Sequence, residues 1–123
     1  MSEIGLKDQC FGVEVEMTGI TREQAAQALA AYFGTTPQHL GAGYDTWSVT
    51  DPEGKVWKLM SDASIQAERK SGGRYVFTGS REYKVEMVTP KLTYPELSKL
   101  QECVRQVRYA GAKVNSSCGI HVH

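Results

Sequence analysis

Three separate segments of the chain alternate between apolar and polar residues. They are residues 10–18, 82–89 and 119–123. A period of two is typical of a β-strand that has one face on a core and the other toward solvent. A chain with such strands at its start, middle and end must build a sheet from segments far apart in sequence. It also leaves one face of that sheet polar.

The polar faces of these three strands carry potential metal ligands. Glu14 and Glu16 share a face of the first strand, Glu86 lies on the second, and His121 and His123 lie on the last. The two glutamates of the first strand are about 6.6–6.8 Å apart along it. Like charges at this spacing repel unless a cation lies between them. A solvated polar face is the ordinary alternative for any one of these residues. Their recurrence in three strands favours a shared site.

Two helices and a hairpin are predicted between these strands. A Thr-x-x-Gln capping box at 21–24 opens a helix that ends near Gly34, and a Thr-x-x-Glu box at 93–96 opens another that ends near Gly111. Both segments carry apolar residues at helical spacing.

The hairpin is predicted from strands 44–50 and 55–60, joined by a type I turn at Asp-Pro-Glu-Gly. Residues 35–43 are expected to be a loop, and residues 74–78 a short strand. The order of elements favours an α+β fold, a mostly antiparallel sheet with two packed helices.

Composition narrows the class of protein. The 123 residues suit a single domain, and Lys+Arg and Asp+Glu both number 14, which argues against a nucleic-acid binder. No stretch is long and apolar enough to cross a membrane. The three cysteines have irregular spacings and form neither a disulfide framework nor a CxxC site. We therefore expect a cytoplasmic protein that binds neither nucleic acid nor membranes.

The candidate ligands are mostly carboxylates, and this favours a hard divalent cation. Mg²⁺ and Mn²⁺ prefer oxygen ligands, and Mg²⁺ is commonly shared with substrate phosphates. Zinc remains an alternative, because Cys118 and His121 are close in sequence.

Five short motifs together resemble a known family. The F-G-x-E-x-E strand at 11–16 is similar to the first strand of carboxylate–amine ligases of the glutamine synthetase and glutamate–cysteine ligase superfamily. More narrowly, the chain resembles the amidoligase family. That family shows W-x-V, D-x-S, E-x-V-S/T-P and C-G-x-H-V-H motifs, which appear here in the same order at 47–49, 62–64, 86–90 and 118–123.

This resemblance implies a partial glutamine synthetase-like catalytic domain and an ATP-dependent reaction. Such ligases phosphorylate a carboxylate, and an amine then attacks the acyl phosphate to form an amide. The implied cofactors are ATP and Mg²⁺ (or Mn²⁺), and the implied substrates are a small-molecule or peptide carboxylate and an amine. Charge neutralisation by metal ions suits phosphoryl transfer, which depends mainly on positioning and electrostatics.

The resemblance also implies roles for individual residues. Glu14 and Glu16 would bind different metal ions, and Glu86 would be a third carboxylate ligand with a catalytic role. His121 would contact both metal and phosphate, and His123 would lie toward the nucleotide or substrate.

The D-x-S motif is expected to contribute in the same way. Asp62 would orient a metal-bound water or the incoming amine as a catalytic residue, and Ser64 would lie on the nucleotide side. Asp and Ser also favour turns, so a simple turn after the hairpin is the alternative for this motif.

Members of the family continue beyond the H-V-H strand. The resemblance therefore implies that residues 1–123 are an N-terminal portion of the catalytic domain, without the phosphate-binding arginines and the last acidic ligand. We expect such a chain to bind metal weakly and to form no amide bonds alone. An unpaired sheet edge would favour a homo-oligomer. Two other functions stay open: a metal-dependent hydrolase that needs no ATP, and a non-catalytic α+β binding module.

Overall fold

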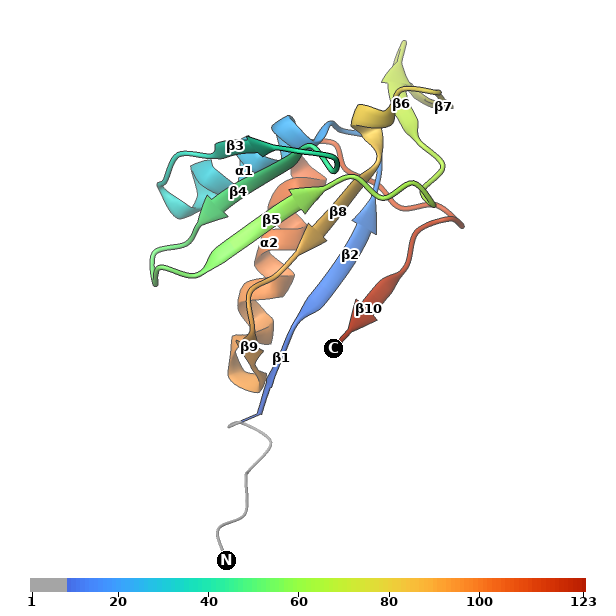
Figure 1. Ribbon diagram of the computed structural model, residues 1–123. Helices are drawn as coiled ribbons and strands as arrows, with labels where there is room; N and C mark the ends of the chain where they lie inside the picture. Colours follow the sequence, from blue (N-terminus) through green and yellow to red (C-terminus); the bar gives the residue numbers. More distant parts are fainter. Residues whose placement is uncertain (1–8) are drawn as a thin grey trace, which may run out of the picture.

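A six-stranded antiparallel sheet forms the centre of the protein. The computed structural model describes residues 9–123, and the strand order is β10-β2-β8-β5-β4-β3 (Figure 1). These strands are β2 (Val13–Met17), β3 (Gln38–Gly41), β4 (Thr46–Thr50), β5 (Val56–Met60), β8 (Val85–Val88) and β10 (Ile120–Val122). Two small antiparallel pairs flank the sheet: β1 (Cys10–Phe11) with β9 (Leu92–Thr93), and β6 (Glu68–Ser71) with β7 (Arg74–Phe77).

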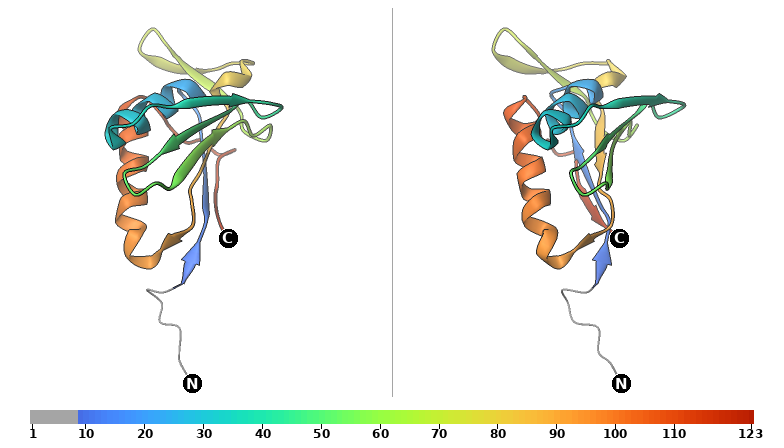
Figure 2. Two further views of the ribbon diagram at one scale, coloured as in Figure 1. Left: turned by 60° about the vertical axis from the view of Figure 1, so that its left-hand side comes forward. Right: turned by 90° about the vertical axis from the view of Figure 1, so that its left-hand side faces the viewer.

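Both α-helices lie on the same side of this sheet. Helix α1 (Arg22–Phe33) and helix α2 (Leu97–Tyr109) are seen together on one side in Figure 2. Two short 3₁₀ helices, η2 (Arg81–Tyr83) and η3 (Tyr94–Glu96), precede β8 and α2. The predicted α+β fold with a mostly antiparallel sheet and two packed helices is confirmed. Within residues 9–123, no helix combines the length and apolar character that a membrane crossing requires.

The apolar faces of two of the three alternating segments form the core under the helices, as predicted. The third segment does not, because Ile120 and Val122 of the edge strand β10 are 69 % and 66 % exposed. The buried residues of β2 are Val13, Val15 and Met17, and those of β8 are Val85 and Met87. Hairpin β4–β5 adds Val49, Trp57 and Leu59 to the same cluster. Because strand side chains alternate between faces, Glu14, Glu16 and Glu86 lie on the face away from the helices.

Both predicted capping boxes are present. Thr21 accepts a hydrogen bond from the backbone N–H of Gln24, and the Gln24 side chain accepts from the Thr21 N–H at 3.0 Å. Thr93 and Glu96 form the second box, but the turn they open is η3, and α2 begins only at Leu97.

The structure corrects several predicted boundaries. Residues 35–43 were expected to be a loop, which is wrong, because Gln38–Gly41 form the edge strand β3 paired with β4. Its residues are mostly exposed, including Leu40 at 57 %, so no core alternation marks the strand. Strand β8 begins at Val85 rather than 82, because η2 takes up the preceding residues. Strand β4 begins at Thr46, since Asp45 has a φ of +46°, which does not fit a strand.

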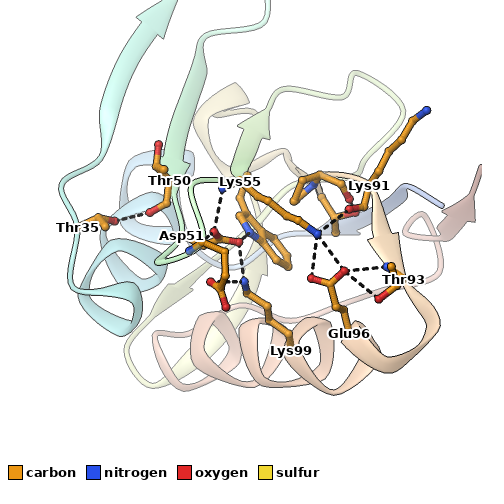
Figure 3. A network of polar contacts seen from close by, with 12 residues as sticks. Thr35, Thr50, Asp51, Lys55, Lys91, Thr93, Glu96 and Lys99 are labelled. Atoms are coloured by element: carbon orange, nitrogen blue, oxygen red, sulfur yellow. Dashed lines mark hydrogen bonds and ion pairs between the residues drawn. The ribbon is translucent and has the colours of Figure 1, made fainter. Parts of the chain in front are cut away.

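The β4–β5 turn is fixed to α2 by a buried carboxylate. The Asp51 side chain is fully buried and accepts hydrogen bonds from Trp57 Nε1 at 3.0 Å and Lys99 Nζ at 2.6 Å (Figure 3). Its other oxygen accepts from the backbone N–H groups of Glu53 and Lys55, both at 2.9 Å. Burial alone would raise the pKa of Asp51, but these donors, Lys99 first, lower it.

A second ion pair lies beside this turn. Lys55 Nζ donates to both carboxylate oxygens of Glu96 at 2.9 Å, and Glu96 also accepts from the Thr93 N–H at 2.9 Å (Figure 3). The Thr93 backbone, followed by Lys55, lowers the pKa of Glu96 to about 2.

We expect Glu96→Gln to destabilise the protein in a pH-dependent way. A carboxyl whose pKa is lower in the folded state stabilises that state above its unfolded pKa of 4.5 and loses this contribution as the pH falls toward 2. Urea unfolding should show a loss of about 1–2 kcal/mol at pH 7 that shrinks steadily below about pH 4.5. Glu102→Gln is the matched control, because its pair with Arg105 is exposed and is worth about 0.5 kcal/mol or less. An equal loss at pH 7 and pH 3 would contradict the prediction.

Candidate metal centre

The strand register brings the predicted ligands together on the open face of the sheet. Strand β2 lies between β10 and β8, so that Glu16 is directly opposite Glu86 and Glu14 is directly opposite His121. Residues directly opposite in an antiparallel pair have Cβ atoms about 4.5–5.5 Å apart. Three segments separated by about seventy and thirty residues in the sequence thus place their polar side chains on one surface.

Three carboxylates form the centre of this surface. One oxygen from each of Glu16, Asp62 and Glu86 lies within 4.8 Å of the other two. We call these residues the acidic cluster. Asp62 joins it from the loop after β5, because Met60 at the end of that strand is directly opposite Glu86.

Glu16 is the most firmly held member of the acidic cluster. It is only 6 % exposed, and its Oε1 accepts the backbone N–H of Gly119 at 2.7 Å. Its Oε2 lies 3.4 Å from Ser64 Oγ. A side chain at Gly119 would crowd this contact, since a Cβ there would lie 3.3 Å from Glu16 Oε1 and 3.6 Å from His121 Nε2. The glycine of the C-G-x-H motif therefore allows β10 to approach the carboxylate closely.

Asp62 is fixed by the turn that it begins. Its Oδ1 accepts the backbone N–H of Ser64 at 2.9 Å and the Ser64 hydroxyl at 2.7 Å, and its carbonyl accepts the N–H of Ile65. The two interpretations of the D-x-S motif are thus compatible. The motif forms a turn, and the turn aims the Asp62 carboxylate at Glu16 and Glu86.

The electrostatics of the acidic cluster favour the uptake of positive charge. Burial, followed by the charge of Glu14, raises the pKa of Glu86 to about 7. The neighbouring Asp62 carboxyl, together with burial, raises the pKa of Glu16, while the pKa of Asp62 itself is lowered by its contact with Glu16. Each raised pKa means that the ionised form is disfavoured. A proton or a cation would relieve this repulsion.

The two histidines lie at the side of the acidic cluster, on β10 and just after it. His121 Nε2 is 3.8 Å from Glu16 Oε1. His123 contacts the Glu14 carboxylate through its Nε2 and, as the first cause, lowers the pKa of Glu14. Glu14 is therefore adjacent to the acidic cluster but is paired with a histidine, which places the two glutamates of β2 in different surroundings.

The donor set fits a hard divalent cation. Oxygen ligands from three carboxylates suit Mg²⁺ or Mn²⁺, which bind proteins through a few carboxylates and complete their shell with water or phosphate. Cys118 lies close in sequence to His121, but its Sγ contacts Asn115 at 3.6 Å and is not among the three ligands grouped here. Within the described residues, the three ligand atoms grouped at this site are all carboxylate oxygens.

Sequence reasoning assigned no role at the site to Gly119, whose N–H contacts Glu16, or to Lys84. The Gly119 N–H depends on the path of the backbone, and only its place in the C-G-x-H motif pointed to it. Lys84 lies two residues before Glu86 and so on the same face, which the alternation signalled. In contrast, the W-x-V motif at 47–49 lies on β4, two strands away from Glu86, with Trp47 stacked on His39 and Val49 in the core.

Comparison with known proteins places the chain in a family. A family model described as "Putative amidoligase enzyme" matches residues 7–123. None of the curated proteins matches the chain. Since the matched segment covers nearly the whole sequence, including the acidic cluster and the histidines, the chain belongs to this amidoligase family.

Proposed function

We propose that this protein is part of an ATP-dependent carboxylate–amine ligase, in which the acidic cluster holds Mg²⁺ or Mn²⁺ for the nucleotide. The observation that carries the proposal is the convergence of Glu16, Asp62 and Glu86 from three distant segments within 4.8 Å. Family membership supports the ligase chemistry, because an amidoligase joins a carboxylate to an amine.

The chain's own residues have distinct parts in this proposal. Glu16 and Glu86 hold the cation from the sheet, and Asp62 holds it from the loop. The Gly119 N–H and the Ser64 hydroxyl orient Glu16. The bound metal ion supplies charge neutralisation for phosphoryl transfer from ATP to the substrate carboxylate.

The two histidines lie beside the acidic cluster, where the phosphates of a metal-bound nucleotide would be. His121 Nε2 lies 3.8 Å from Glu16 Oε1, and His123 contacts Glu14, so both imidazoles lie at the side of the acidic cluster. An imidazole N–H in this position can donate a hydrogen bond to a phosphate or an acyl oxygen. We propose this role for His121, and a place toward nucleotide or substrate for His123.

Calorimetric titration with ATP tests the first half of the proposal. We expect the 123-residue chain to bind ATP in the presence of Mg²⁺ or Mn²⁺, and to lose this binding when EDTA is added. Metal-independent binding, or no binding, would contradict it. Hydrolysis of esters or phosphodiesters that needs the metal but no nucleotide would instead favour the hydrolase.

Trapping with hydroxylamine tests the chemistry. Phosphoryl transfer from ATP to the carboxylate gives ADP and an acyl phosphate, and hydroxylamine attacks the acyl phosphate to give a hydroxamate and inorganic phosphate. The protein should form hydroxamate from ATP and a suitable carboxylate, and ADP should be released in the same amount. Hydroxamate formation without ATP, or ADP release with no hydroxamate for any carboxylate tried, would contradict the ligase chemistry.

A further inference from the structure

A pocket opens directly beside the acidic cluster, beyond the end of the sheet. It has a volume of about 460 Å³ and lies between the β5–β6 loop and the end of β7. Its walls include Ser64, Phe77 and Lys84, with Ile65 and Ala67 as buried apolar residues. In Figure 1 the β6–β7 hairpin extends past the ends of β2, β5 and β8 at this place.

Ser64 and Lys84 connect this pocket with the acidic cluster. Ser64 lines the pocket, and its Oγ also contacts Asp62 at 2.7 Å and Glu16 at 3.4 Å. Lys84 lines the pocket and lies two residues before Glu86 on the same face, about 6.6–6.8 Å away along the chain. A ligand in the pocket would therefore contact a residue, Ser64, that itself contacts two members of the acidic cluster.

The Lys84 ammonium is weakly engaged by the protein itself. Within the described residues, its hydrogen bond is to the carbonyl of Ala63 at 3.3 Å, which is long. The other lysines with short contacts in this fold, such as Lys99 and Lys113, have carboxylate partners at 2.6–2.9 Å. The Lys84 ammonium is therefore free to bind an anion such as a phosphate beside a metal ion.

Phe77 is a large apolar side chain on the pocket wall that the fold does not cover. It is 73 % exposed, and it ends β7 directly opposite Glu68. An exposed aromatic ring that lines the pocket together with the apolar residues Ile65 and Ala67 offers a face on which a flat ring can stack.

We propose that this pocket is the base-binding subsite for a nucleoside triphosphate, with Phe77 stacking on the base and Lys84 binding its phosphates beside the acidic cluster. The inference rests on the proposed function. A nucleotide is the ligand class that combines a flat aromatic group with a metal-binding polyphosphate. In the pocket, Phe77 offers a stacking surface for the base. Lys84 and the neighbouring acidic cluster offer charges for the phosphates and their metal ion.

Three probes separate the two contacts: MgATP, magnesium tripolyphosphate and adenosine, each titrated calorimetrically. Phe77→Ala should weaken MgATP binding about 5- to 150-fold, the range for loss of one stacked base, and leave tripolyphosphate binding unchanged. Lys84→Gln should weaken MgATP and tripolyphosphate binding about tenfold and leave adenosine binding unchanged. Phe77→Trp, which keeps a stacking surface, should retain MgATP binding.

Matched controls come from residues outside the pocket. Tyr109→Ala removes an aromatic ring that is 77 % exposed at the end of α2, and Lys91→Gln removes a lysine on the β8–β9 connection. Both should bind MgATP as the unmodified chain does. If MgATP binds and depends on Glu86 but not on Phe77 or Lys84, the subsite is wrong and the ligase proposal stands. If the unmodified chain binds no ATP, both proposals fail.

Discussion

Replacing Glu86 by Gln should weaken metal binding and stabilise the metal-free protein at the same time. Glu86 lies directly opposite Glu16, and like charges in such a pair are destabilising. Glutamine keeps the shape of the side chain and removes the charge. We expect Mn²⁺ affinity to fall at least about tenfold, which corresponds to about 1.4 kcal/mol of binding free energy. The free energy of unfolding without metal should rise by about 0.5–1 kcal/mol.

The two measurements are Mn²⁺ titration by electron paramagnetic resonance and urea unfolding in EDTA, both at pH 8. At this pH most Glu86 side chains are ionised, because burial raises the pKa of Glu86 only to about 7. Glu82→Gln is the control, since Glu82 is an exposed acid in η2, four residues earlier. If the variant unfolds at higher free energy but binds Mn²⁺ more weakly, the Glu86 carboxylate contributes to metal binding and not to stability. If Glu86→Gln destabilises the metal-free protein, Glu86 has a structural role and the metal centre loses its main support.

The sequence predicts the sheet well where one face of a strand is buried. Strands β2 and β8 follow a period of two because their apolar residues pack under the helices, and this period is visible in the sequence. The edge strand β10 has the same period, but its Ile120 and Val122 are exposed, so alternation there does not report burial. Strand β3 has no such signal. It is an exposed edge strand that forms by pairing its backbone with β4. Its formation therefore depends on the tertiary structure.

The candidate site could be predicted as a set of residues but not as an arrangement. Alternation places Glu14, Glu16 and Glu86 on polar faces, yet it does not say which strands are neighbours. The order β10-β2-β8 puts Glu16 opposite Glu86 and pairs Glu14 with the histidines instead. The contribution of Asp62 depends on where the loop after β5 runs, and that path is set by long-range pairing of β5 with β8.

Replacing Asp51 by Ala should be the most destabilising single change considered for this protein. The Asp51 carboxylate is fully buried and binds Lys99, Trp57 and two backbone N–H groups of the turn. Its removal leaves a largely buried ammonium and a buried indole N–H without their acceptor. Breaking a buried ion pair on one side costs about 3–5 kcal/mol. Urea unfolding at pH 7 should show a loss of this size.

Glu53→Gln is the sharpest control for Asp51, because Glu53 binds the same ammonium from an exposed position. The Glu53 side chain is 61 % exposed and lies 2.9 Å from Lys99 Nζ, so its loss should cost less than about 1 kcal/mol. The Lys99→Met variant completes a double-mutant cycle. The loss of unfolding free energy in the variant with both Asp51→Ala and Lys99→Met should be well below the sum of the two single losses. Additive losses would mean that Asp51 acts through the turn alone.

The Asp51→Ala change should not affect metal binding. Asp51 is at the start of the β4–β5 turn and Asp62 follows the far end of β5, so Asp51→Ala protein that remains folded should bind Mn²⁺ with unchanged affinity. The Asp51 network thus stabilises the fold, whereas the acidic cluster, as the proposed metal site, is expected to lower the stability of the metal-free protein.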